Sequence, residues 1–204
     1  WLNAQVGRLS SVVFAPYPDR LPQLPAVGGG VMRVKSSNGA GESSIDVRSP
    51  RYGIQYYGHQ GPVMLYGGVT PGSKPANPAG EIGYWAGGRL YMPASGPANL
   101  AGSSVGLHFD GGTDTKDSPT TKIENTYRRI MPAVNLRVAD LLDVQAAYVI
   151  AQDDNWTLAS TKKKLEYSGV RLVGSFFANE RWVVSTHYDN YTSDDDSLLP
   201  DYHF

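Results

Sequence analysis

The sequence predicts an all-β protein, with strands in an antiparallel up-and-down meander that forms a transmembrane β-barrel of about nine or ten strands. Apolar and polar residues alternate with period two in one segment after another, while helical spacing is nearly absent. Long and short connections also alternate along the chain, as in a meander with tight turns at one end of the sheet. Residues 1–204 are therefore expected to form a single barrel domain or part of a larger one.

The alternation places strands in order from the first residues onward. Leu2, Ala4 and Val6 alternate with polar residues, and the segments 51–57 and 62–70 flank a tight turn at 58–61. Later segments that carry one apolar and one polar face are 81–92, 105–110, 129–138, 142–150 and 181–189. The stretch 138–150 also contains helical spacing, so a helix and a hairpin both remain open there. A strand beginning at Leu198 is a candidate for the tenth.

The connections fall into two groups that alternate along the chain. Short links are expected at 139–141 and 178–180, and long polar links at 71–80, 111–121, 152–163 and 192–200. The longest connection, 15–49, contains several prolines and the run Gly28–Gly30, and its pieces 31–35 and 45–48 could pair as a small hairpin. We expect this long loop to fold over or into the barrel.

Composition excludes several classes of protein. The 204 residues include 23 Gly, 14 Pro and 13 Tyr but no Cys, so neither a disulfide framework nor a thiolate metal site can form. The 18 basic and 19 acidic residues give a formal net charge of −1, which leaves no electrostatic footprint for nucleic-acid binding. No apolar run is long enough for a transmembrane helix, whereas membrane-spanning strands produce no hydropathy peak.

The character of the two strand faces favours a membrane barrel over a soluble one. The polar faces carry Arg, His, Asp, Asn and Gln, whereas lysines gather near the loops and aromatic residues near the strand ends, as in the aromatic girdles of membrane barrels. The apolar faces include small residues such as Ala86, Gly88 and Ala146, to which lipid can conform but which would leave voids in a packed core. A soluble extracellular β-sandwich remains the alternative.

On this interpretation the polar strand faces line a pore. The candidate pore-lining residues are Arg51, Glu81, Arg89, His108, Asp110, Arg129, Asn135, Arg137, Arg171, Arg181, His187 and Asp189. Arginines outnumber carboxylates in this set, which would favour anions. The alternative is that these residues pair across strands and only hold a polar interior together.

No arrangement of residues predicts an enzyme. His59, His108, His187 and His203 lie in separate segments without metal-binding spacing, and Gly28–Gly30 lacks the helix that a phosphate-binding loop needs. We therefore predict no catalytic residue, no metal and no cofactor. The acidic run Asp194, Asp195 and Asp196 is a candidate cation-binding loop, because carboxylate oxygens suit hard cations, with solvated loop charge as the alternative.

Short motifs in roughly the first 70 residues resemble bacterial outer-membrane porins. They are the segment Asn-Ala-Gln-Val-Gly-Arg at 3–8, the segment Ser-Pro-Arg-Tyr-Gly-Ile-Gln-Tyr-Tyr-Gly at 49–58, and the strand-like segment 63–68. Porins of this kind need about 16 or more strands, which is more than the chain provides.

The resemblance implies a protein of the bacterial outer membrane that contacts lipid and lipopolysaccharide and allows passive diffusion of small solutes or anions. It also implies a homo-oligomer or a partner chain that completes the barrel. Two alternatives stay open, namely a soluble extracellular β-sandwich used for binding or surface assembly, and a barrel that forms a sheath around a partner electron-transfer protein.

Overall fold

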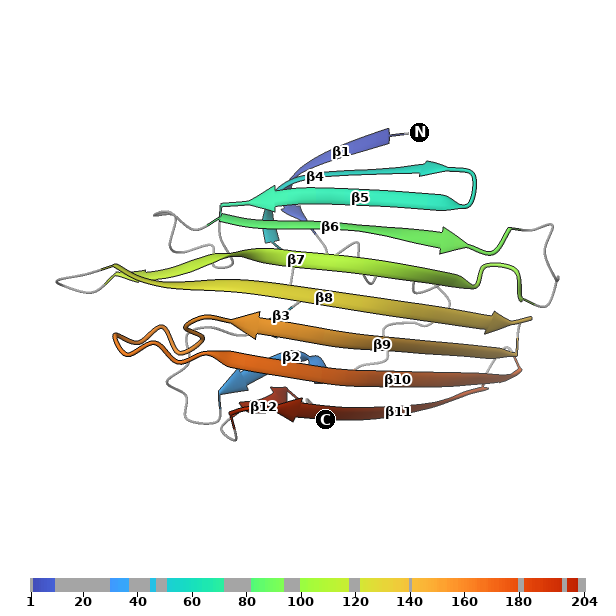
Figure 1. Ribbon diagram of the computed structural model, residues 1–204. Helices are drawn as coiled ribbons and strands as arrows, with labels where there is room; N and C mark the ends of the chain where they lie inside the picture. The colour runs from blue at the N-terminus through green and yellow to red at the C-terminus, as the bar shows by residue number, and fades with distance from the viewer. Residues whose placement is uncertain are drawn as a thin grey trace.

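Most described residues belong to one large antiparallel sheet (Figure 1). The computed structural model describes residues 2–9, 30–36, 45–46, 51–71, 82–93, 100–117, 122–139, 141–179, 182–195 and 198–201. The nine-stranded sheet has the order β1 (Leu2–Leu9), β4 (Arg51–Gln60), β5 (Val63–Thr70), β6 (Ile82–Tyr91), β7 (Ser104–Asp117), β8 (Lys122–Val138), β9 (Leu142–Asp153), β10 (Leu165–Asn179) and β11 (Trp182–Ser193). The predicted all-β antiparallel meander is confirmed, and the ambiguous stretch 138–150 contains the end of β8 and most of β9, which pair with each other as antiparallel strands.

A second, three-stranded sheet contains β12 (Leu198–Asp201), β2 (Gly30–Ser36) and β3 (Ile45–Asp46) in that order. The expected small hairpin within the long loop 15–49 is confirmed, since Arg33 pairs with Asp46 and Val34 with Ile45. The rest of that loop lies outside the described residues. The candidate tenth strand at Leu198 does form, but it pairs with β2 and not with β11, so it does not extend the large sheet.

The large sheet is not closed into a barrel, which differs from the prediction. Its order begins at β1 and ends at β11, and no pairing joins these two strands among the described residues. The strand count excludes one kind of closure. In a nine-stranded antiparallel sheet the first and last strands run in the same direction, as Figure 1 shows, so an antiparallel ladder cannot join them directly.

Two turns differ from their predicted positions. The β4–β5 turn consists of Gly61 and Pro62 and not of residues 58–61, because Gln60 still pairs with Val63 and Gly61 takes the left-handed φ of 57°. The expected long loop 111–121 is mostly strand, since β7 and β8 stay paired out to Asp117 and Lys122. Residues 111–117 are all Gly or polar, so the sequence had no apolar–polar alternation there to indicate a strand.

The two faces of the large sheet differ sharply in chemistry and exposure. On the face we call the apolar face, exposed side chains include Leu65, Leu90, Val105, Leu107, Ile130, Val134, Leu136, Ile150, Leu172, Phe176 and Val184. On the opposite face, which we call the charged face, buried side chains include Arg89, His108, Asp110, Arg129, Asp143 and Arg171. The burial pattern of β8 alternates residue by residue between these two environments.

The small sheet lies against the charged face. Strand β2 contacts β10 and β11, which are neighbours at one edge of the large sheet. Leu172 and Tyr188 on the apolar face of those two strands are exposed, whereas the side chains of Arg171 and Asp189 on the opposite face are 8% and 2% exposed, which agrees with β2 lying over the charged face. No described helix has the length and hydropathy of a membrane span.

Candidate functional site

The centre of the charged face is the guanidinium group of Arg129. Its Nη1 lies 3.5 Å from a carboxylate oxygen of Asp110 on β7, and its Nη2 lies 3.7 Å from Oδ1 of Asp153 on β9. The group also lies over the ring of Tyr127, 4.2 Å from its centroid. Asn125 donates a hydrogen bond of 2.7 Å to Asp153, so the carboxylate is held from two sides. Arg129 thereby links three neighbouring strands.

Two further ion pairs join adjacent strands on the same face. Arg137 on β8 lies 3.8 Å from Asp143 on β9, and Arg171 on β10 lies 4.0 Å from Asp189 on β11. In each case the two residues are direct cross-strand partners in the ladder. The pairs therefore follow from strand register, because directly opposed residues project to the same side of a sheet.

Among the side chains that the structure describes, the carboxylates of this face are at least as numerous as the arginines, whereas the predicted anion preference also counted Arg51 and Arg181, whose side chains lie outside the described part. The arginines are Arg89, Arg129, Arg137 and Arg171, and the carboxylates are Asp110, Asp114, Asp143, Asp153 and Asp189. An arginine excess favours anions only where the positive charge is not compensated nearby. The cross-strand pairing considered as an alternative describes the observed geometry.

The structure brings together most of the predicted pore-lining residues. Those on the charged face are Arg89, His108, Asp110, Arg129, Asn135, Arg137, Arg171, His187 and Asp189. Arg51 begins β4, but its side chain is outside the described part, as are Glu81 and Arg181. The sequence analysis missed three residues of this face, Asp114, Asn125 and Asp153. Asp114 and Asp153 lie in segments that were interpreted as loops, and Asn125 precedes the predicted start of its strand at residue 129.

Two carboxylates of the candidate cation-binding loop already interact with other parts of the protein. Asp195 is buried and its carboxylate lies 2.7 Å from Nζ of Lys163. Asp194 accepts a hydrogen bond of 2.9 Å from the backbone N–H of Glu166. Asp196 lies outside the described residues. In the described part of the chain, no three His, Asp or Glu side chains converge as metal ligands.

Aromatic and amide side chains are frequent on the charged face of β4, β5 and β6. The indole N–H of Trp85 donates to Gln55, at 3.3 Å, and Gln55 donates in turn to Gln5, at 3.2 Å. Farther along the strands, the hydroxyl of Tyr66 lies 3.3 Å from Nδ1 of His108, with the two rings stacked. These contacts reach across whole strands.

Glycines make this reach possible. The Tyr66 ring lies over Gly87 of β6 and the Trp85 ring over Gly68 of β5, at positions where a Cβ atom would collide with the ring. The Tyr66 ring therefore crosses β6 and reaches His108 on β7, and the Trp85 ring crosses β5 and reaches Gln55 on β4. Glycine in a strand interior frequently marks such a close approach.

Replacing Gly87 with Ala is expected to lower the free energy of unfolding by about 1–3 kcal/mol, because the new methyl group forces the Tyr66 ring away from His108. Chemical denaturation in detergent measures the effect. The control is Gly174→Ala, since a Cβ atom there meets only the Thr186 methyl group, at 3.6 Å. Equal stability of the two variants would show that the Tyr66 ring does not need Gly87.

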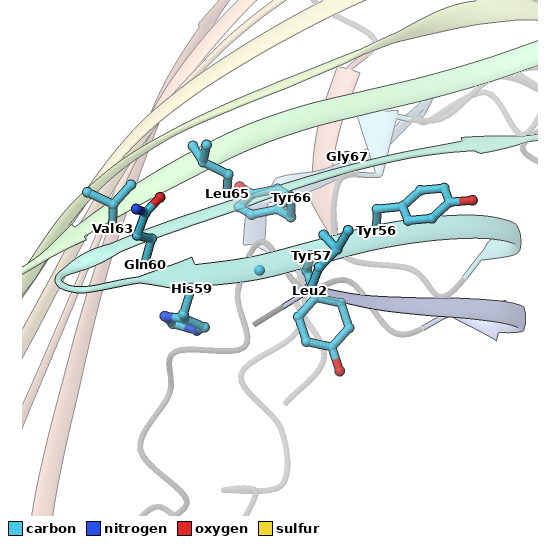
Figure 2. A pocket seen from close by; sticks show the side chains of 10 residues that line it. Leu2, Tyr56, Tyr57, His59, Gln60, Val63, Leu65, Tyr66 and Gly67 are labelled. Atoms are coloured by element: carbon cyan, nitrogen blue, oxygen red, sulfur yellow. The ribbon is translucent and has the colours of Figure 1, made fainter.

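A hollow of about 790 Å³ wraps the β4–β5 hairpin near the first residues of β1 (Figure 2). Figure 2 shows Tyr57 and His59 on one side of the hairpin and Val63 and Leu65 on the other. The hollow therefore opens onto both faces of the sheet at this edge. Its volume falls within the range of small-molecule sites.

Comparison of the chain with protein-family models, with characterised proteins and with solved structures finds no match.

Proposed function

We propose that the chain forms the wall of a porin-like β-barrel in a bacterial outer membrane, through which small solutes diffuse passively without an enzymatic step. The observation that carries the proposal is the exposure of the apolar face beside a buried charged face. Leu90 is 51% exposed and Val184 is 66% exposed, whereas Arg129 is 3% exposed. In a soluble protein, Leu and Val side chains are usually buried and Arg side chains are usually exposed.

The extent of the apolar face supports contact with lipid. Exposed apolar side chains run across all strands of the large sheet, and a contiguous patch of that kind is rare on soluble monomers. Between Ile130 and Val138 on β8, and between Leu142 and Ile150 on β9, no side chain of the apolar face is charged. Each stretch spans about 27 Å along the strand, or about 20 Å at the usual tilt, near the apolar band of about 25 Å in membrane barrels.

The residues that bound this apolar stretch also suit a membrane. At the end of the sheet that carries the long loops, the apolar stretch gives way to polar residues on the same face. They are Arg128 on β8, Gln152 on β9 and Glu166 on β10. At the short-turn end, Trp182 begins β11 and is exposed. Charged groups beyond the apolar stretch and amphipathic rings at its border are typical of proteins that cross a bilayer.

The soluble sandwich is less well supported. It requires the apolar faces of two sheets to pack together with Arg89 and Arg137 in solvent. The small sheet contacts β10 and β11 from the charged face, and Arg89 is buried. The sheath around an electron-transfer partner has no specific observation in its favour.

A channel requires the sheet to close, and the strand directions limit how this can happen. Because β1 and β11 run the same way, an all-antiparallel barrel needs an odd number of added strands between them. Two copies inserted in the same orientation would bring β11 of one against β1 of the other in parallel. We therefore propose that a partner supplies an odd number of strands, which pair with the free edges of β1 and β11 and close the barrel.

Reconstitution into planar bilayers, with the partners that co-purify from the outer membrane, is expected to give stepwise ionic conductance. The permeability ratio of potassium to chloride should lie near unity, because the carboxylates of the charged face balance its arginines. A chain that stays a compact monomer in water without detergent, and gives no conductance, would contradict the proposal.

A further inference from the structure

Asp153 is a fully buried carboxyl group at the long-loop end of the charged face. It is the last residue of β9, three positions beyond Ile150, where the apolar stretch of that strand ends. Its Oδ1 accepts a hydrogen bond from Asn125, whereas its Oδ2 is buried and has no hydrogen-bond partner among the described residues. A carboxylate in this position loses hydration at Oδ2 that no described group replaces.

The nearest cation is shared between two carboxyl groups. Nη1 of Arg129 lies 3.5 Å from Asp110, and Nη2 lies 3.7 Å from Asp153, so both distances exceed the length of about 2.8 Å that is usual for a charge-assisted hydrogen bond. Asp114 brings a further carboxyl group close, because it pairs in register with Asn125, which donates to Asp153. Asp153 therefore has part of one counter-charge and two carboxyl neighbours.

The described titratable and charged side chains that face Asp153 come from three strands. They are Asp110 and Asp114 on β7, Tyr127 and Arg129 on β8, and Tyr167 on β10. Burial raises the pKa of Asp153 above its ordinary value, and it outweighs the opposing effects of Arg129 and of the Asn125 hydrogen bond. The negative charges of Asp114 and Asp110 act in the same direction as burial.

Asn125 connects this carboxyl group to the loop between β9 and β10. Its Oδ1 accepts a hydrogen bond of 2.8 Å from the backbone N–H of Asn155, and its own amide donates to Asp153. The side chain of Asn155 donates in turn to the backbone carbonyl of Ala159 within the loop, at 2.9 Å. A change of charge at Asp153 therefore acts on a buried network that holds the base of this loop.

We propose that Asp153 is a proton-binding site of the charged face, and that it keeps its proton at mildly acidic pH, where solvent-exposed aspartates have lost theirs. The bound proton converts a buried, partly hydrogen-bonded carboxylate into a neutral acid and removes its repulsion by Asp110 and Asp114. When the proton leaves, the face gains one negative charge. The resulting pH dependence of ion selectivity rests on the proposed channel, whereas the proton site itself does not.

Infrared difference spectroscopy of the detergent-solubilised protein tests the site directly, because the C=O stretch of a protonated carboxyl group is distinct from that of a carboxylate. In a titration upward from about pH 4, the ordinary pKa of Asp, wild-type protein should retain a protonated-carboxyl band that Asp153→Asn removes. The control is Asp154→Asn at the adjacent, exposed position, which should keep the band. Asp114→Asn removes a neighbouring negative charge and should make the band disappear at a lower pH.

Stability gives a second readout with a defined sign. Because the folded protein favours the protonated acid, Asp153 costs no stability below about pH 4, where the unfolded chain is protonated as well. The free energy of unfolding of wild-type protein, relative to that of Asp153→Asn, should fall as the pH rises through the pKa of Asp153 in the folded state. Denaturant unfolding over the same pH range measures this difference.

The outcomes separate this inference from the channel. Absence of a protonated-carboxyl band above about pH 4, or its persistence in Asp153→Asn, would overturn the proton site. If circular dichroism shows that Asp153→Asn does not fold, Asp114→Asn decides, and a band that titrates at an unchanged pH in that variant overturns the site. Conductance without the band would remove this inference alone, whereas the band without conductance would remove the channel alone.

Discussion

Replacing Arg129 with Met is expected to lower the free energy of unfolding by about 3–5 kcal/mol, one of the two largest effects of any single substitution considered. The guanidinium group lies between the carboxylates of Asp110 and Asp153, and all three side chains are almost fully buried. Removing the cation leaves two buried carboxylates without their central counter-charge. Denaturant unfolding of the detergent-solubilised protein, followed by tryptophan fluorescence, measures the loss.

The neighbouring residue provides a matched control. Arg128 precedes Arg129 in β8 but points to the opposite face and is exposed. Arg128→Met should change the free energy of unfolding by no more than about 0.5 kcal/mol. If the two variants lost the same stability, Arg129 would not be the cation that links β7, β8 and β9.

Replacing Val134 with Arg is expected to cost about 2–4 kcal/mol in a lipid bilayer, because Val134 is 47% exposed within the apolar stretch of β8. A guanidinium group there must be moved from water into hydrocarbon. Folding into lipid vesicles, monitored as a function of denaturant, measures the cost.

Asn135→Arg is the control for this substitution, since Asn135 is the next residue and lies on the charged face. Its cross-strand partners on β7 and β9 are Ser104 and Gln145, so this position has polar neighbours. Asn135→Arg should be better tolerated than Val134→Arg in vesicles. The reverse order would indicate that the apolar face is not the one in contact with lipid.

Strand alternation made most of the large sheet predictable from the sequence. Val134, Leu136 and Val138 alternate with Asn135 and Arg137, and these two sets lie on opposite faces as expected. The ion pair of Asp110 and Arg129 follows from the same alternation. Both residues lie on the polar face of their strands, and the register places them directly opposite each other. Local pattern is sufficient for such features, since period two fixes the face of every residue in a strand.

Features that depend on long-range pairing were not predictable. The pairing of β12 with β2 joins segments more than 160 residues apart in the sequence. The local sequence of neither strand indicates which other strand it pairs with. The crossing of Tyr66 over Gly87 depends on which residue of β6 lies opposite β5. Whether β1 pairs with β11 is a long-range property of the same kind, and no local pattern in either strand determines it.

Lipid contact along one strand is the measurement that tests the central claim most directly. The chain contains no Cys, so single cysteines at residues 170–176 of β10 can each carry a fluorescent label in an otherwise unlabelled protein. After reconstitution, brominated acyl chains should quench labels at Val170, Leu172, Gly174 and Phe176, and aqueous iodide should quench those at Arg171, Val173 and Ser175 more strongly. Quenching by lipid without this alternation, or stronger on the charged face, would contradict a membrane-spanning sheet.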